Sequence, residues 1–387
     1  LGGRGRLVTA ISRAKMADQG SITMNRSIES VAWLALFMAL GCTRPAEDRT
    51  HGDLDVGHAQ SAAFDVEVGS GLAAVRSLSN DALVLWLSAP SVDLSLVVHQ
   101  TLQLELRVEN AMATLELSNL EGGGIVPISS GAGSTKKSWL LTLTPGSWHF
   151  QLAAPHAAEK GRFRFALLSD VQEAIDRVQD VYRVINAQPE LDFLLGAGDL
   201  TEEGEVEELQ RFQRELATLD VPYYTTLGNH ELGEEDPPPY QAWFGRANFQ
   251  FAHRGVYFTL LDSASATVDP LADDWLDSWL ANARESVHVV AMHIPPFDPV
   301  GTRNAGFASR AEAAALIGKL AQAGVDLTLY GHIHSYYSFQ NAGIPAFISG
   351  GGGAAPELAS DIGRHFMVFE LDATRGVLSS EVVRVDQ

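Results

Sequence analysis

Two regions of the chain differ in the spacing of their hydrophobic residues. Between about residues 62 and 157, apolar and polar positions alternate with a period of two, as along residues 102–108, where Leu and Val alternate with Gln, Glu and Arg. Such alternation is typical of strands with one buried face. Turn residues, such as Pro145 and Gly146, separate the runs. This pattern predicts a small all-β sandwich domain over residues 62–157.

The second half of the chain follows a different rhythm. From about residue 161, strand-like apolar runs alternate with segments whose apolar residues recur at helical spacing, as along residues 175–185. Strands that alternate with helices in this way indicate βαβ units and a mainly parallel sheet. We therefore predict an α/β domain over residues 161–387. Residues 42–61 are polar with little periodicity, so they are predicted to form a tether.

Several strand-like runs of the second region are followed directly by residues that bind metals or transfer protons. These residues are Asp170 with Gln172, Asp199, Asn229 with His230, His293, and His332 with His334. Because ligands bind at the carboxyl ends of strands in open α/β sheets, these side chains are expected to meet in one crevice. Carboxylate, imidazole and amide oxygen together suit Mn, Fe, Zn or Ni. No Ser or Cys nucleophile motif accompanies them.

The order of these motifs resembles a known signature. Asp-x-His, Gly-Asp, Gly-Asn-His-[Asp/Glu], His and Gly-His-x-His is typical of the calcineurin-like metallophosphoesterases, which include purple acid phosphatases and cyclic-nucleotide phosphodiesterases. The chain resembles this family over residues 161–387, with Gln172 where the family has a His. The resemblance implies a four-layer αββα sandwich and a dinuclear centre. It also implies hydrolysis of a small phosphomonoester or phosphodiester, with metal-bound hydroxide as the nucleophile.

The resemblance assigns a role to each of these residues. Asp199 would bridge two divalent or trivalent ions, one of them held also by Asp170, His334 and Gln172. The other ion would be held also by Asn229, His293 and His332. His230 would protonate the leaving group. Apart from the resemblance, the position of Glu202 shortly after Asp199 suggests that its carboxylate orients His230. Glu202 also belongs to an acidic run over residues 202–208, which is typical of a solvated helix face.

Other functions fit the same sequence. A cyclic-nucleotide phosphodiesterase or a nucleotidase would carry the same motifs, and Gln172 leaves open a degenerate member that binds phosphorylated ligands without turnover. An adhesin or scaffold would use the β domain as its active part. There, Trp86, Trp139 and Trp148 either bind carbohydrate or belong to the core.

The charge of the chain limits its partners. With 27 Lys and Arg against 48 Asp and Glu, the formal net charge is −21. Such a surface repels long polyanions, and no basic cluster with interleaved aromatic residues is present, so an extended nucleic-acid footprint is not expected. A small phosphoester drawn in by the metal ions is compatible with this charge. The sequence indicates no protein partner.

The N-terminal segment predicts export. Residues 31–41 form an apolar run of signal-peptide length, preceded by Met24, which we take as the true start. The tetrapeptide Ala39-Leu40-Gly41-Cys42 resembles a bacterial lipobox and contains the only cysteine. We expect residues 1–41 to be a signal peptide and Cys42 to carry a lipid anchor in the bacterial cell envelope, on the periplasmic or outer-membrane face. A plain secretory signal is the alternative.

Overall fold

The computed structural model describes residues 46–120, 125–128, 135–235, 237–301, 304–357 and 362–386. The predicted signal peptide and Cys42 therefore lie outside the described residues. Within the described residues, no helix has both the length and the apolar character needed to cross a membrane.

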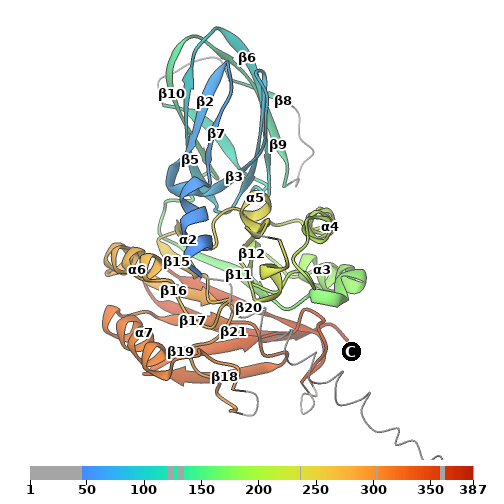
Figure 1. The fold of residues 1–387 in the computed structure, drawn as a ribbon, viewed down its shortest axis with the longest axis vertical. Coiled ribbons are helices and arrows are strands. Elements are labelled where there is room, and N and C mark those ends of the chain that lie inside the picture. The colour runs from blue at the N-terminus through green and yellow to red at the C-terminus, as the bar shows by residue number, and fades with distance from the viewer. Residues whose placement is uncertain are drawn as a thin grey trace, which may run out of the picture. The chain divides into compact units, whose positions relative to one another are not determined.

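The N-terminal strands form two five-stranded sheets (Figure 1). The first has the order β1 (His58–Gln60), β2 (Phe64–Val68), β5 (Ser91–Val98), β10 (Gly146–Ala153) and β7 (Glu116–Asn119). The second has the order β3 (Ala73–Leu78), β4 (Ala82–Leu87), β6 (Leu102–Glu109), β9 (Lys137–Leu143) and β8 (Ile125–Ile128). Alternate residues of β5 and β6 are buried, as the period of two predicted. The all-β sandwich is confirmed.

The tryptophans of this sandwich pack into hydrophobic cores: Trp139 and Trp148 into that of the sandwich, and Trp86 into the neighbouring core of the second region. Trp86 and Trp139 are only 5% and 6% exposed. Trp148 is partly buried and stacks on Phe150, with ring centroids 6.4 Å apart. These positions favour the core interpretation over a carbohydrate platform.

The second region contains two further sheets, in which most neighbouring strands are parallel. One has the order β13 (Tyr223–Thr226), β12 (Leu191–Ala197), β11 (Arg162–Leu168), β20 (His365–Asp372) and β21 (Gly376–Arg384). The other has the order β14 (Phe249–His253), β15 (Val256–Leu261), β16 (Val287–Met292), β17 (Leu327–Tyr330), β19 (Ile344–Ser349) and β18 (Tyr336–Asn341). We call them the β11 sheet and the β16 sheet.

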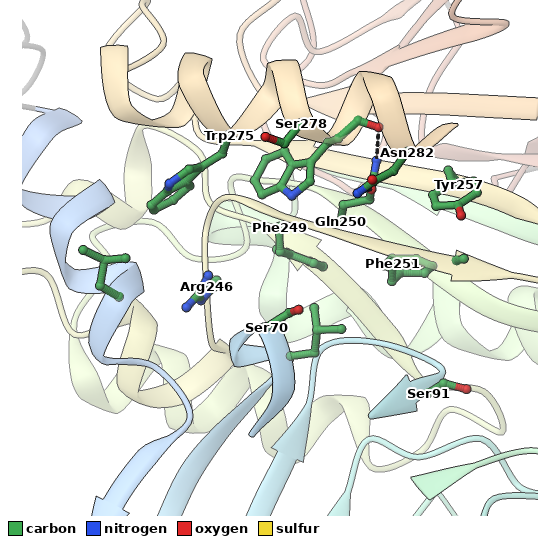
Figure 2. Close-up of a pocket in the computed structure, with 14 residues that line it drawn as sticks. Ser70, Ser91, Arg246, Phe249, Gln250, Phe251, Tyr257, Trp275, Ser278 and Asn282 are labelled. Atoms are coloured by element: carbon green, nitrogen blue, oxygen red, sulfur yellow. Dashed lines mark hydrogen bonds between the residues drawn. The ribbon is translucent and has the colours of Figure 1, made fainter. Parts of the chain in front are cut away.

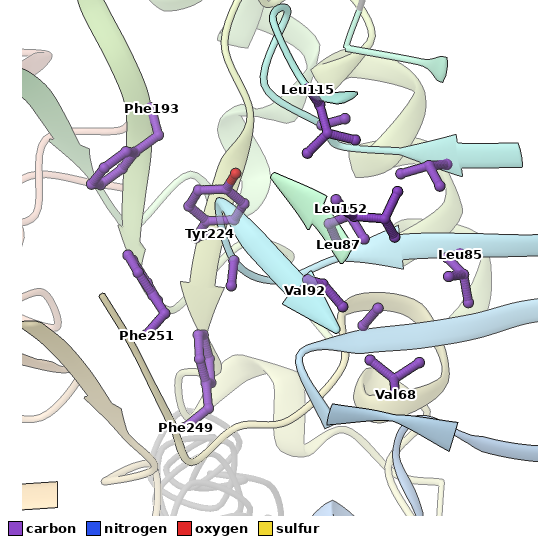
Figure 3. Close-up of a cluster of buried hydrophobic side chains, with 14 of the residues drawn as sticks. Val68, Leu85, Leu87, Val92, Leu115, Leu152, Phe193, Tyr224, Phe249 and Phe251 are labelled. Atoms are coloured by element: carbon purple, nitrogen blue, oxygen red, sulfur yellow. The ribbon is translucent and has the colours of Figure 1, made fainter. Parts of the chain in front are cut away.

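Helices cover the outer faces of these two sheets. The helices are α3 (Val178–Asn186) and α4 (Val206–Leu216) on the β11 sheet, and α6 (Pro270–Ala283) and α7 (Arg310–Ala323) on the β16 sheet. Between the sheets lie aromatic rings in mutual contact: Phe165 stacks on Phe193, and Phe258 meets both edge to face. The predicted αββα sandwich is confirmed. Its inner core continues into the β-sandwich, as Tyr224, Phe251, Leu87 and Val92 show in Figure 3.

The structure corrects the predicted tether over residues 42–61. Helix α2 (Ala46–Asp55) and strand β1 occupy most of this segment, and the helix packs near α6. Its polar residues made it resemble a solvated linker, but several of them are buried because they are paired. Arg49 is 2% exposed and binds the Asp262 carboxylate, with Nε donating to Oδ2 at 2.7 Å and Nη2 to Oδ1 at 3.2 Å.

A second buried acid of the helix holds a loop of the second region. Asp53 is fully buried, and its carboxylate accepts hydrogen bonds from the backbone N–H groups of Ala247 and Asn248, both at 2.9 Å. The Asn248 side chain also donates to it at 3.0 Å. A sequence pattern based on apolar spacing misses such a helix, because its buried surface is built from polar groups that satisfy one another.

This pairing leads to a stability prediction. Replacing Arg49 with Met should lower the free energy of unfolding by about 3 kcal/mol, because the buried Asp262 charge loses its partner. Denaturant unfolding measures this loss. Arg107→Met is the matched control, because Arg107 binds Glu105 at the exposed surface. A loss below about 1 kcal/mol for Arg49→Met, the level expected of exposed pairs, would contradict the prediction.

Candidate metal centre

Five parallel strands end at one place in the fold. Strands β11, β12 and β13 of one sheet precede Asp170, Asp199 and Asn229, and strands β16 and β17 of the other precede His293 and His332. The backbone N–H of His332 donates to Asp170 Oδ1 at 2.9 Å, which joins the two sheets at these ends. The structure therefore brings these residues together at the carboxyl ends of their strands.

The two aspartates lie in tight, buried turns. Asp170 and Asp199 are 0% and 1% exposed, and both have left-handed backbone conformations, with φ of 61° and 53°. Such φ values are uncommon outside glycine and are most readily adopted by Asp and Asn. The Asp170 N–H donates to the Gly198 carbonyl at 3.2 Å, so the two turns are bonded to each other. Both carboxylates are thereby fixed before any ligand binds.

Two glycines allow the neighbouring loops to approach these carboxylates. A Cβ placed on Gly228 would lie 2.1 Å from Asp199 Oδ1, and one on Gly331 would lie 2.7 Å from Asp170 Oδ2. Any larger residue would push the carboxylate away. The glycines of Gly-Asn-His-Glu and Gly-His-Ile-His thus have a steric function.

Asp199 and His293 form the centre of the cluster. The His293 Nδ1–H donates to the Ala197 carbonyl at 2.7 Å, so its Nε2 faces the site. Nε2 lies 3.1 Å from Asp199 Oδ2 and 3.1 Å from Asn229 Oδ1. Two oxygens and the lone pair of a neutral imidazole would therefore converge on one point. Such a set needs a proton or a metal cation at that point.

The electrostatics of the buried pair agree with this requirement. Burial opposes ionisation, yet Asp199 raises the pKa of His293 to about 9, and His293 lowers the pKa of the Asp199 carboxyl below its ordinary value. Burial raises the pKa of Asp170, which has no such close histidine contact. A metal ion bound at Nε2 would replace the proton that this raised pKa favours on His293, because metal ligation requires the neutral ring.

The remaining histidines complete two groups of candidate ligands. His334 donates its Nδ1–H to the Ala355 carbonyl at 2.6 Å, and its Nε2 lies 3.5 Å from Asp170 Oδ1. The His332 ring lies 5.1 Å from the His293 ring, centroid to centroid. Ligand atoms of Asp199, His293 and His332 fall within 4.8 Å of one another, as do those of Asp170, Asp199 and His334. The two groups share Asp199, so the donor set fits a pair of borderline metal ions.

Gln172 lies beside Asp199, but its amide nitrogen, not its oxygen, faces the carboxylate. It is buried, and its Nε2 donates to Asp199 Oδ2 at 2.7 Å and lies 3.4 Å from His334 Nε2. The side chain thus presents an N–H donor to the bridging carboxylate, where a ligand would present oxygen. A 180° rotation of the side-chain amide would exchange Nε2 and Oε1, so that the oxygen would face the site. An amide oxygen is still a weaker ligand than imidazole for a borderline metal.

We expect the ion between Asp170 and His334 to be held weakly. Dialysis should remove it first, and Gln172→His should retain it under the same conditions, because imidazole replaces the amide. Metal content and activity during a chelator titration measure the effect. Gln188→His, at the end of α3, is the control. Simultaneous loss of both ions from the unmodified protein would contradict the prediction.

His230 stands beside the cluster. Its Nδ1–H donates to the Glu202 carbonyl oxygen at 2.6 Å, and its Nε2 lies 4.0 Å from Asp199 Oδ2. Glu202 thus contacts His230 through its backbone carbonyl, whereas the carboxylate that we expected to orient the ring lies 3.9 Å from Nδ1. Burial disfavours the charged ring, yet Asp199 and the Glu202 carbonyl raise the pKa of His230 overall. Nε2 is the ring nitrogen that faces the site.

Sequence reasoning gave no role to Glu231, the last residue of Gly-Asn-His-Glu. Its fully buried carboxylate accepts five hydrogen bonds. The donors are the backbone N–H groups of Asp199, Leu200, Thr201 and Gly228 and the Thr201 hydroxyl, at 2.8–3.0 Å. Glu231 therefore fixes the loop of Asp199 to the loop of Asn229. Its place in the motif was the only signal available in the sequence.

Comparisons with known proteins agree with this geometry. Residues 163–336 match the family model described as calcineurin-like phosphoesterase. A 3',5'-cyclic-nucleotide phosphodiesterase of Nostoc sp. is 28% identical over 41% of this chain and 61% of its own length. The 3',5'-cyclic adenosine monophosphate phosphodiesterase CpdA of Pseudomonas aeruginosa is 31% identical over 44% of this chain and 64% of its own length.

Among solved structures, that of PhoD is similar with a TM-score of 0.46 and 13% identity, covering 76% of this chain and 87% of PhoD. The chain spans less than two thirds of the length of the two cyclic-nucleotide phosphodiesterases. The matched segment contains the first four motifs and the Gly-His-Ile-His motif. The family model therefore spans all the candidate ligands of the site.

Proposed function

We propose that this chain is a metal-dependent phosphodiesterase that acts on a small phosphodiester. The observation that carries the proposal is the convergence of Asp199, His293 and Asn229 on one point, with a second group of Asp170 and His334 sharing Asp199. Asp170, Asp199 and His334 would hold one ion. Asp199, Asn229, His293 and His332 would hold the other, and Gln172 would stay on the edge of the first.

The side chains of the site have separate tasks. When bound, the metal ions would supply Lewis-acid stabilisation of the phosphoryl oxygens and lower the pKa of an attacking water. Asp199 holds the two ligand groups together. His230, placed by the Glu202 carbonyl, presents Nε2 toward the site and would donate a proton to the leaving oxygen. Glu231 keeps Asp199 and the His230 loop in register.

The preference for a diester rests on the relatives. The two cyclic-nucleotide phosphodiesterases and a probable glycerophosphodiester phosphodiesterase of Arcobacter nitrofigilis, 25% identical over 48% of this chain, all bear the names of phosphodiesterases. A 3',5'-cyclic nucleotide is therefore the first substrate to test. A phosphomonoesterase, a nucleotidase and a non-catalytic phosphate binder are the competing functions.

The deciding experiment compares model substrates. Bis(p-nitrophenyl) phosphate, p-nitrophenyl phosphate and 3',5'-cyclic AMP are offered to the protein with and without added Mn²⁺. We expect Mn²⁺-dependent hydrolysis of the two diesters, and slower hydrolysis of the monoester. Asp199→Asn is the matched inactive control, because it removes the shared carboxylate charge at nearly constant volume. Turnover of the monoester alone indicates a phosphatase. No turnover with bound metal indicates a binding protein.

We also propose that the protein is exported and anchored through Cys42. The motivating observation is that this cysteine closes the apolar run of residues 31–41. Wild type is expected to partition with membranes, and Cys42→Ser to remain soluble or unprocessed. Only residues 43–45 separate Cys42 from helix α2, which binds Asp262 of the catalytic region, so the anchor would hold that region near the bilayer. An unmodified Cys42 thiol on a free mature protein would refute anchoring.

A further inference from the structure

A cleft lies between the β-sandwich and the β16 sheet, at the end of that sheet opposite to the metal centre. It has a volume of about 530 Å³ and is lined by 14 residues. Figure 2 shows Trp275, Ser278 and Asn282 of helix α6 on one side, Ser70 and Ser91 of the sandwich on the other, and Arg246 between them. Strand β14 forms its floor.

The cleft has no residue in common with the metal centre. It reaches Tyr257 at the beginning of β15, whereas His293 follows the end of the parallel neighbour β16. The two sites therefore lie at opposite ends of the same sheet. A ligand of the cleft would bind independently of the phosphoesterase chemistry.

The charge of the cleft is opposite to that of the protein. The chain carries a formal net charge of −21, yet no Asp or Glu is present among the described residues that line the cleft. Arg246 is its one formally charged lining residue. In a protein this acidic, a cleft with a single cation and no carboxylate is selective for a weakly anionic ligand.

Arg246 has bonding capacity left over. Its Nε is buried and has no hydrogen-bond partner among the described residues. Gly71, with φ of 63°, allows the guanidinium to lie close, because a Cβ there would be 2.2 Å from Nε. The guanidinium carbon lies 5.9 Å from the centre of the Trp275 ring, at the outer limit of a cation–π contact. Because Nε is enclosed by the protein, a ligand in the cleft would meet the terminal N–H groups of the guanidinium.

The rest of the lining suits a sugar. Trp275 and Trp279 are one helical turn apart on α6 and half-buried, with ring centroids 6.1 Å apart and planes inclined by 53°. Gln250 links the strand to the helix, since its Nε2 donates to the Trp279 carbonyl at 3.0 Å. Aromatic faces pack against the C–H faces of pyranose rings, while serine hydroxyls and the Asn282 amide match sugar hydroxyls.

We propose that this cleft binds a carboxylated saccharide, a uronic-acid oligosaccharide. Arg246 pairs with the carboxylate, and Trp275 and Trp279 stack on the sugar rings. A carboxylate fits better than a phosphate because one guanidinium forms a bidentate pair with a monoanion. A dianionic phosphate would be repelled by the negative charge of the protein, and Arg246 would neutralise only one of its two charges. An extended peptide pairing with edge strand β14 is the competing occupant.

The test is a calorimetric titration of the full protein with tetragalacturonate, in the presence of inorganic phosphate to occupy the metal centre. The fully methyl-esterified tetrasaccharide is the matched ligand, because it differs only in its carboxylates. Wild type should bind tetragalacturonate with a Kd below about 1 mM and the ester at least about tenfold more weakly. Arg246→Gln should remove this preference, and Trp275→Ala should weaken both ligands about tenfold or more.

The control variant is Trp148→Ala, which removes a partly buried tryptophan outside the cleft and should bind as wild type does. Melting temperatures show that each variant is folded, and Arg246→Lys gives a second variant that keeps the charge without the planar fork. Equal binding of the acid and its ester, a Kd for the acid above about 1 mM, or binding unchanged in both Arg246→Gln and Trp275→Ala overturns the proposal.

Discussion

Replacing His230 with Ala is expected to slow hydrolysis of an alkyl phosphodiester by roughly 10²–10⁴-fold, the usual contribution of a positioned general acid. The expectation rests on geometry. The Nδ1–H is committed to the Glu202 carbonyl at 2.6 Å, so Nε2 alone can transfer a proton, and it lies 4.0 Å from the carboxylate shared by both ligand groups.

The leaving group separates this role from a structural one. An aryl leaving oxygen is stable without a proton, so His230→Ala should affect bis(p-nitrophenyl) phosphate much less than an alkyl diester. Metal content should remain unchanged, because His230 is absent from both candidate ligand groups. His149→Ala, on the exposed part of the sandwich, is the control. Equal rate losses with alkyl and aryl substrates, or an alkyl rate within a few-fold of wild type, would exclude the acid role.

Much of the fold was predictable because burial leaves a regular trace in sequence. The period of two along residues 102–108 became strand β6, and the helical spacing of residues 175–185 became η2 (Gln172–Arg177) and α3. The site was predictable for a related reason. Parallel strands bring their carboxyl ends together, so chemistry-bearing residues that follow different strands are placed in one crevice.

Other features could not be predicted because they depend on polar partners distant in sequence. Helix α2 resembled a tether, since nothing near Arg49 reveals that Asp262, 213 positions away, neutralises it. For the same reason, Gln172 could be placed in the site from its motif, but its N–H bond to Asp199 could not be foreseen. Glu202 was identified as a partner of His230, although its backbone carbonyl makes the contact.

Glu231 is the clearest example of a residue whose partners are distant in sequence. Its replacement is predicted to lower both the stability and the activity of the protein. Replacing Glu231 with Gln should lower the free energy of unfolding by about 4 kcal/mol. An amide has only one oxygen, so an NH₂ group would face either the two donors on Asp199 and Gly228 or the three donors on Leu200 and Thr201. Each unsatisfied donor costs about 1–3 kcal/mol.

The same substitution should slow catalysis by about 10²-fold in the protein that remains folded. Glu231 determines the position of the Asp199 loop, and a displacement of about 1 Å of a catalytic group is enough for such a loss. Because the positioning of a ligand is affected, metal affinity should fall together with the rate, and added Mn²⁺ should recover part of the activity. Denaturant unfolding, metal titration and initial rates measure the three effects.

Glu208→Gln provides the matched control for Glu231→Gln. The Glu208 carboxylate accepts one hydrogen bond, from the Glu203 N–H at 2.8 Å, in an exposed position. Its substitution should change the free energy of unfolding by less than about 1 kcal/mol and leave the rate unchanged. If Glu231→Gln were as mild as this control, the five hydrogen bonds would not be what fixes Asp199. If it lost stability but kept full activity and metal affinity, Glu231 would serve the fold without positioning the site.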